Sequence, residues 1–250
     1  MLQKLDISNI LFFDAETVSG KATYEELSEP MQELWRIKCK SILRQYDEEI
    51  SPEQAAELYP EKAGIYAEFG KIVCISVGIV VKDGASGRPS LRLKSFANQD
   101  EAVLLTEFCE LINQYYGNPN KHYFCGHNIR EFDIPYVCRR LLINQLPLPG
   151  MLNISGKKPW ELKYFLDTLE MWKFGDYKNY TSLKLLAAVF GFPSPKDDID
   201  GSMVGRVFWQ DDELDRISQY CEKDVLAVVQ LLLRYLRMPL LEEDQIKSVS

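Results

Sequence analysis

The sequence predicts an α/β protein in which helices flank a mixed β-sheet of five strands. Three observations carry this prediction: an apolar stretch near the N-terminus that ends in acidic residues, two β-branched stretches joined by a turn, and short apolar stretches that alternate with helical patterns in the second half. Strands that first form a hairpin and then alternate with helices are typical of a mixed sheet with helical layers. We expect a single domain over residues 1–250.

The five expected strands are short apolar stretches bounded by turn residues. They cover residues 10–13, 72–81, 91–96, 123–126 and 164–168. The second and third are rich in Val, Ile and Leu, and the glycine-containing stretch 82–87 between them is typical of a hairpin turn. Residues 10–13 lead directly into Asp14 and Glu16, which indicates a buried strand that delivers carboxylates at its end.

Residues 18–69 differ in character and predict a helical insertion after the first strand. Residues 31–46 show helical periodicity, and Ser51 followed by Pro52 is typical of an N-cap with proline in the first turn of another helix. The insertion is either a lid or wall for a substrate or a packed excursion without a functional role. The residues leave both interpretations open.

Later helices are expected over residues 100–116, 133–144, 182–190 and 212–236, with a loop over 193–200 between the last two. Pro135 is compatible with the second of them because proline is tolerated in the first turn. The charged tail, about 240–250, is expected to be frayed.

The composition limits the classes of function. A net charge of −8 argues against a general electrostatic grip on nucleic acid, so a polyanionic substrate has to be held by local basic groups or by metal ions. The six cysteines form no CxxC pair and indicate reduced thiols rather than a disulfide framework or a zinc site. The longest apolar stretch is too short to span a bilayer, so we expect a cytoplasmic protein without a membrane partner.

Carboxylates recur where strands end and on the last helix. Asp14 and Glu16 are two residues apart on a strand, so their side chains share one face, which suits a pair of metal ligands as well as a solvated turn. Asp133 is expected near a helix start, close to the end of a strand. Tyr220 and Asp224 are four apart on a helix, which stacks them on one face.

Together the segments are more specific than each is alone. Asp-x-Glu at the first strand, Asn-x-x-x-Phe-Asp-x-Pro around Asp133, and Tyr-x-x-x-Asp on the last long helix resemble the DEDD superfamily of 3′–5′ exonucleases, in its tyrosine subgroup (DEDDy, DnaQ-like). In the sister subgroup a histidine stands five residues before the last aspartate, where this chain has Gln219. Residues 69–73, 126–128 and 200–204 further resemble the predicted exonucleases related to the proofreading domain of family B DNA polymerases.

The resemblance implies an RNase H-like fold and hydrolysis of phosphodiesters with two divalent cations, Mg²⁺ or Mn²⁺. Asp14 would be shared by both ions, Glu16 and Asp224 would complete the shell of the first, and Asp133 would hold the second. Tyr220 would orient the attacking water by a hydrogen bond rather than remove its proton, because a free phenol has a pKa near 10. A carboxylate cluster without His or Cys fits hard Mg²⁺.

Further residues are candidates for contacts with the substrate. Asn128 and Phe132 adjoin Asp133, and Lys157, Lys158 and Trp160 offer charge and stacking to a strand, although a solvated loop explains the last three slightly better. His127 is expected to be a hydrogen-bonded structural imidazole. Asp167 would either support the site or cap the next segment.

Three functions remain open at this stage. The leading hypothesis is a 3′–5′ exonuclease acting on single-stranded DNA ends; the second is a 3′–5′ exoribonuclease with the same site. The third is a catalytically silent module that binds nucleic acid. The sequence does not reveal whether the protein has a protein partner.

Overall fold

The computed structural model describes residues 5–82, 84, 87–176, 178, 180–193 and 199–249. Three residues of the expected hairpin turn (Asp83, Ala85 and Ser86) and most of the expected loop 193–200 lie outside the described residues.

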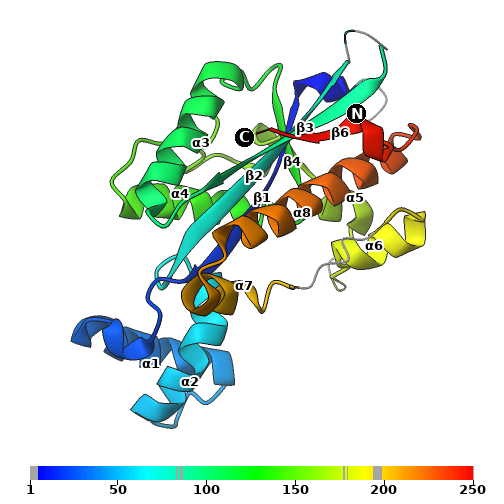
Figure 1. The fold of residues 1–250 in the computed structure, drawn as a ribbon. Coiled ribbons are helices and arrows are strands. Elements are labelled where there is room, and N and C mark those ends of the chain that lie inside the picture. Colours follow the sequence, from blue (N-terminus) through cyan, green and yellow to red (C-terminus); the bar gives the residue numbers. More distant parts are fainter. Residues whose placement is uncertain are drawn as a thin grey trace.

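The centre of the fold is a six-stranded mixed sheet in the order β5-β4-β1-β2-β3-β6 (Figure 1). The strands are β1 (Ile10–Ser19), β2 (Gly70–Lys82), β3 (Pro89–Ala97), β4 (Tyr123–Gly126), β5 (Phe165–Asp167) and β6 (Ile246–Ser248). β1 to β3 form an antiparallel meander, whereas β4, β5 and β6 join in parallel pairings. The mixed α/β sheet is confirmed, but the expected number of strands was wrong, because β6 is a sixth.

The sixth strand comes from the tail that was expected to be frayed, and that expectation was also wrong. Arg88 forms ion pairs with Glu242 (2.9 Å) and Asp244 (3.2 Å) just before β6. The side-chain amide of Gln230 exchanges two hydrogen bonds with the backbone of Leu241, at 2.8 and 3.0 Å. These contacts fix the polar tail against β3, and its own three-residue strand carries no alternating pattern that could have predicted it.

Helices cover both faces of the sheet. They are α1 (Glu29–Leu43), α2 (Pro52–Lys62), α3 (Glu101–Tyr115), α4 (Asp133–Ile143), α5 (Thr168–Lys173), α6 (Leu183–Phe190), α7 (Val204–Arg206) and α8 (Leu214–Tyr235). Figure 1 shows α3 and α4 on one face, and α8 with α5 and α6 on the other. None of the described helices is long and apolar enough to cross a membrane.

Strand β1 separates two hydrophobic cores by the alternation of its side chains. Leu11 and Phe13 pack into the core under α3 and α4, whereas Ile10 and Phe12 pack into the core under α8. Even-numbered positions of β1 therefore face α8. At Gly78 of β2 an added Cβ would lie 2.9 Å from Val225 Cγ1, so a glycine there allows α8 to pack closely on the sheet.

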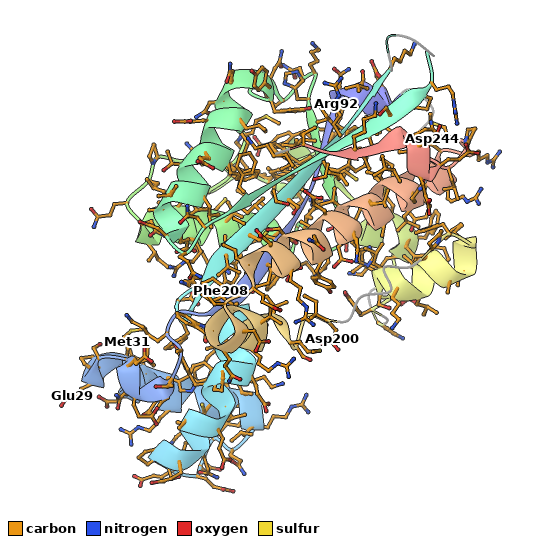
Figure 2. The ribbon with its side chains drawn as sticks, viewed as in Figure 1. Glu29, Met31, Arg92, Asp200, Phe208 and Asp244 are labelled. Atoms are coloured by element: carbon orange, nitrogen blue, oxygen red, sulfur yellow. The ribbon has the colours of Figure 1, made fainter. Side chains whose placement is uncertain are left out.

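The expected helical insertion lies between β1 and β2 and contains α1 and α2. It has a small core of its own around Trp35, which is fully buried and donates from Nε1 to the Ala55 carbonyl at 2.9 Å. Ser51 and Gln54 form the capping box at the start of α2. Figure 2 shows Glu29 and Met31 on α1, beyond the end of the sheet, and Phe208 where the segment before α8 meets the insertion.

An ion pair between Glu101 of α3 and Arg140 of α4 joins these two helices to the end of the insertion. Glu101 contacts Arg140 Nη2 at 2.5 Å and accepts a hydrogen bond from the Ile72 amide at 2.7 Å, while Arg140 Nη1 donates to the Ala67 carbonyl at 2.8 Å. Because Glu101 is buried, Arg140 is half-buried and both are hydrogen-bonded, loss of either would leave the other unpaired. The hydrogen bond to Ile72 thus fixes the start of β2, which pairs with the end of β1 that carries Glu16.

Candidate active site

Strand β1 carries Asp14 and Glu16 past the end of its parallel neighbour. Pairing with β4 stops at Phe12 and Cys125, while pairing with β2 continues through Asp14 and Glu16. A register shift follows directly after Glu16. Both carboxylates lie at even positions and therefore face α8, whereas Ala15 packs toward the opposite core, as expected.

Helix α8 meets these carboxylates through three residues of one turn. The Cys221 thiol lies 3.4 Å from the Asp14 carbonyl and 3.6 Å from Asp14 Oδ2. Tyr220 and Asp224 flank it, and the phenol of Tyr220 donates a hydrogen bond to the Asp224 carboxylate. The spacing of four thus brings Tyr220 and Asp224 together on the face that the sequence predicts.

Asp133 is the first residue of α4 and is buried, with 4% of its surface exposed. Its carboxylate accepts hydrogen bonds from the amide of Ala15 and from its own amide. The bond to Ala15 joins the start of α4 directly to β1. Asp133 therefore lies beside the pair on β1, although more than a hundred residues separate them.

The loop before Asp133 is held by Asp167 at the end of β5. Asp167 accepts hydrogen bonds from the amides of Asn128 and Arg130, both at 3.0 Å, and also caps α5 through the Leu169 amide at 2.9 Å. Both expected roles of Asp167 are thus present in one carboxylate. Gly126 allows the loop to turn here, because an added Cβ would lie 2.8 Å from the Phe13 carbonyl oxygen.

The four carboxylates form one electrostatic cluster. Burial raises the pKa of Asp14 well above its ordinary value, and the charges of Asp133, Glu16 and Asp224 raise it further. Burial, followed by the charges of Asp224, Cys74 and Asp133, likewise raises the pKa of Glu16. Burial raises the pKa of Asp133 to about 7, against its two hydrogen bonds from backbone amides. Without a cation the cluster is therefore destabilised by desolvation and mutual repulsion.

Tyr220 is not prepared to act as a base. Burial raises the pKa of its phenol, and the charges of Asp224, Glu16 and Asp14 raise it further. The phenol therefore stays protonated at neutral pH, so it can donate and accept hydrogen bonds but does not act as a base. This agrees with an orienting role.

A pocket of about 280 Å³ opens beside Glu16. Phe132 lines it from the loop before α4, Glu61 and Ile65 line it from the insertion, and Ser202 lines it from the segment before α7. The insertion thus contributes one wall of the space next to the carboxylates. This favours the substrate-wall interpretation over a packed excursion.

The remaining expected contact residues are placed differently. Asn128 adopts a positive φ of 66° in the loop that Asp167 holds, a conformation that asparagine tolerates. Lys157, Lys158 and Trp160 lie before β5, near Tyr123 at the opposite end of β4 from the carboxylates. The structure therefore brings Phe132 to the carboxylates and does not bring the lysines and Trp160 there.

His127 is a structural imidazole, as expected. Its Nδ1 lies 2.9 Å from Thr168 Oγ1, and its Nε2 lies 3.0 Å from the Thr181 carbonyl. The ring thereby holds the segment that carries Tyr180.

Two residues next to the carboxylates escaped sequence reasoning. Cys221 was interpreted only as a reduced core thiol, although its place inside the Tyr-x-x-x-Asp motif was a signal that it faces β1. Tyr180 is 67% exposed, and burial followed by the charges of Asp133, Asp167 and Asp14 raises its pKa, so its phenol lies near the cluster. No spacing signal links Tyr180 to the motifs.

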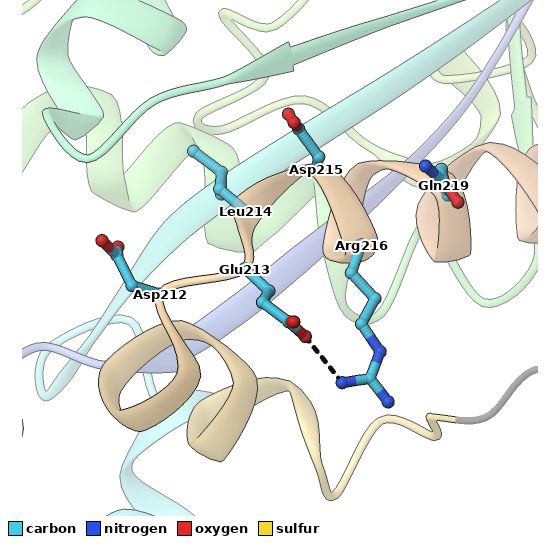
Figure 3. A pocket seen from close by; sticks show the side chains of 6 residues that line it. All are labelled: Asp212, Glu213, Leu214, Asp215, Arg216 and Gln219. Atoms are coloured by element: carbon cyan, nitrogen blue, oxygen red, sulfur yellow. Dashed lines mark hydrogen bonds and ion pairs between the residues drawn. The ribbon is translucent and has the colours of Figure 1, made fainter.

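An acidic pocket lies at the start of α8, and Figure 3 shows the side chains that line it. Its side chains are exposed or half-buried, and Glu213 pairs with Arg216 at 2.7 Å. Gln219 is exposed and also lines this pocket. These residues supply matched surface controls for the buried cluster.

The comparisons with known proteins agree with this arrangement. Residues 65–248 match the family model described as "Predicted 3'-5' exonuclease related to the exonuclease domain of PolB". The chain belongs to this family. The match includes Asp133, Tyr220 and Asp224, whereas Asp14 and Glu16 lie before its first residue.

Solved structures show the same fold, and a family B DNA polymerase is one example. The family B DNA polymerase of the hyperthermophilic archaeon Pyrobaculum calidifontis aligns with a TM-score of 0.52 and 15% sequence identity. The alignment covers 91% of this chain and 24% of the polymerase chain, so the protein corresponds to about a quarter of that enzyme. This likeness establishes the RNase H-like fold. No curated protein matches the chain.

The residues at the cluster fit the divalent cations that such exonucleases use. One oxygen each of Asp14 and Glu16 and the Cys221 sulfur lie within 4.8 Å of one another. Hard cations prefer carboxylate oxygens, and positive charge would relieve the repulsion that raises the pKa of these groups.

Proposed function

We propose that the protein is a 3′–5′ exonuclease of the tyrosine subgroup that hydrolyses single-stranded DNA from its 3′ end with two divalent cations. The observation that carries this proposal is the convergence of Asp14 and Glu16, Asp133 and Asp224 from three distant segments into one cluster beside a pocket. Stable carboxylate clusters of this kind need positive charge. A phosphodiester, being an anion, needs the same charge in order to approach.

The proposed ligand set assigns each carboxylate a place. Asp14, on which the charges of the other three carboxylates act, would be a ligand of both Mg²⁺ or Mn²⁺ ions. Glu16 and Asp224 would complete the first site, and Asp133 would serve the second. When bound, the two cations lower the pKa of the attacking water and stabilise the leaving oxygen.

The other groups of the chain orient the reactants. Tyr220 donates its one hydroxyl hydrogen to Asp224, so its oxygen accepts a hydrogen bond from the attacking water and orients it without taking its proton. The Ala15 amide fixes the carboxylate of Asp133. Phe132 offers an aromatic ring to the terminal base in the pocket next to Glu16.

The experiment uses a 3′-labelled oligonucleotide with Mg²⁺ or Mn²⁺. The protein should release labelled mononucleotide, and both Asp14→Ala and a chelator should abolish the release. Activity that survives both treatments would contradict the proposal. A 5′-labelled copy of the same oligonucleotide distinguishes 3′–5′ degradation from the reverse polarity.

Substrate class and binding without catalysis are decided by the same assay. Preferential digestion of a matched RNA oligomer would replace the DNA proposal with an exoribonuclease. Metal-independent binding without hydrolysis under any divalent cation would indicate a silent binding module. We place the protein in a reducing, cytoplasmic compartment, because all six cysteines are free thiols.

A further inference from the structure

A basic and aromatic pocket lies at the end of the sheet opposite the carboxylates. It has a volume of about 470 Å³ and is lined by Lys157, Lys163, Trp160, Tyr123 and Tyr164, among others. Small-molecule pockets typically span roughly 300–1,000 Å³, so one nucleotide is an appropriate occupant. We refer to it as the lysine–tryptophan pocket.

The charge of this pocket contrasts with that of the chain. Residues 157–163 contain three lysines and one glutamate, whereas the whole chain carries a net charge of −8. All three lysines are exposed, and none forms an ion pair with a carboxylate in the part of the chain that the structure describes. Their positive charge is therefore available to an anion from outside.

Trp160 is exposed and held in place. Its side chain is 62% exposed, on a one-turn helix that begins with Pro159. The turn is closed by hydrogen bonds between Lys158 and Glu161, at 2.8 and 2.9 Å. An indole kept in solvent on a rigid turn loses little entropy when a planar partner stacks on it.

The base of the pocket is also rigid and aromatic. Tyr164 is buried and donates to the Met151 carbonyl at 3.0 Å, and Lys157 Nζ lies 3.5 Å from its hydroxyl. Lys158 Nζ lies 5.0 Å from the centre of the Trp160 ring. Ammonium groups next to exposed aromatic rings are the combination that binds phosphates and stacks bases of an unpaired strand.

We propose that the lysine–tryptophan pocket is an accessory site that binds single-stranded nucleic acid several nucleotides behind the 3′ end in the carboxylate cluster. The proposal rests on the function proposed above and extends it to the substrate's upstream part. Charge favours a polyanion over an apolar partner, and stacking on Trp160 requires unpaired bases.

The register of the sheet sets the minimum separation of the two sites. Ile10 pairs with Tyr123 at the pocket, and Asp14 is four residues further along β1. At about 3.3 Å per residue this is roughly 13 Å. A stacked strand advances about 3.4 Å per nucleotide, so at least about four nucleotides separate the sites, and more if the strand bends around the sheet.

The test measures binding in chelator, where no hydrolysis should occur, and turnover in Mg²⁺. In chelator, fluorescence anisotropy of a labelled 16-mer should show that Trp160→Ala weakens binding about 5- to 150-fold, which is the loss that stacking on one base predicts. Trp160→Phe should retain most of the affinity. The double variant Lys157→Ala with Lys158→Ala should make the slope of log K against log salt less negative by about 1.4.

Arg92 and Lys247 provide the matched control, because they are exposed cations on β3 and β6, at the edge of the sheet opposite β5. Replacing both by alanine removes the same charge and should leave the slope unchanged. With Mg²⁺, Trp160→Ala should raise KM for the 16-mer but not for a 4-mer, and kcat should not change.

The outcomes separate this inference from the proposed function. Unchanged 16-mer affinity in Trp160→Ala would overturn the accessory site while leaving the exonuclease intact. An equal change of the salt slope in the Lys157 and Lys158 double variant and in its control variant would do the same. Trp160-dependent binding with no hydrolysis under any cation would contradict only the exonuclease. Stronger binding of duplex than of single strand would also overturn the accessory site.

Discussion

The two ends of the sheet are built in opposite ways. At one end, carboxylates from β1, α4 and α8 meet, and burial together with mutual repulsion raises the pKa of Asp14 and Glu16. At the other end, the lysine–tryptophan pocket takes its charge from one exposed loop, residues 157–163. The acidic end depends on the whole fold and on a counter-ion. The basic end depends on a local turn and responds to salt.

The strongest test of this contrast is the loss of one buried carboxylate. Asp14→Asn should lower kcat/KM for a single-stranded oligonucleotide by at least about 10³-fold, because a bound cation contributes several kcal/mol to the transition state. Asp215→Asn, which removes an exposed acid from the same helix as Asp224, should change it less than about twofold. Similar losses in both variants would show that net charge, rather than the cluster, controls activity.

Removing the Tyr220 hydroxyl tests orientation at the acidic end. Tyr220→Phe keeps the ring and loses its hydrogen bond to Asp224, so kcat should fall about 10- to 100-fold, as for a hydrogen bond to a charged group. KM should stay unchanged. A pH profile that loses a limb in this variant would contradict the orienting role, because it would indicate that the phenol transfers a proton.

Monovalent salt should affect KM and kcat differently in the unmodified protein, because the two ends of the sheet differ in exposure. Raising monovalent salt from about 50 to 200 mM at constant Mg²⁺ should increase KM for a long oligonucleotide about sevenfold if two lysines contact phosphates. The kcat should not change, because the buried cluster is screened much less. A salt effect on kcat alone would show that the basic end does not hold the strand.

The smallest expected effect concerns stability without metal. At pH 8 in chelator, Asp14→Asn removes one charge from a repelling cluster and should raise the free energy of unfolding by about 1 kcal/mol, or Tm by about 2–4 °C. Mg²⁺ should raise the Tm of the natural protein and not that of the variant. Calorimetry with Asp215→Asn as control measures both; a lower Tm for Asp14→Asn in chelator would show that the cluster is not strained.

Much of the fold was predictable because the signals are local. β4 lies at the predicted residues, α4 begins at Asp133, and the predicted N-cap at Ser51 is present. Strand β6 and the π-helical turn Val207–Asp211 were missed, since neither has an apolar period of its own. Tertiary contacts, such as those of Arg88, stabilise β6 instead.

The candidate site was predictable in its members and not in its surroundings. Strand alternation and helical spacing determine which way Asp14, Glu16, Tyr220 and Asp224 point, and these rules act over a few residues. Strand order and register decide three other features of the site. They decide which pocket the insertion lines, how close Cys221 comes to Asp14, and at which end of the sheet Lys157 and Trp160 lie. Those are set by packing between segments far apart in the chain, so only the folded structure decides them.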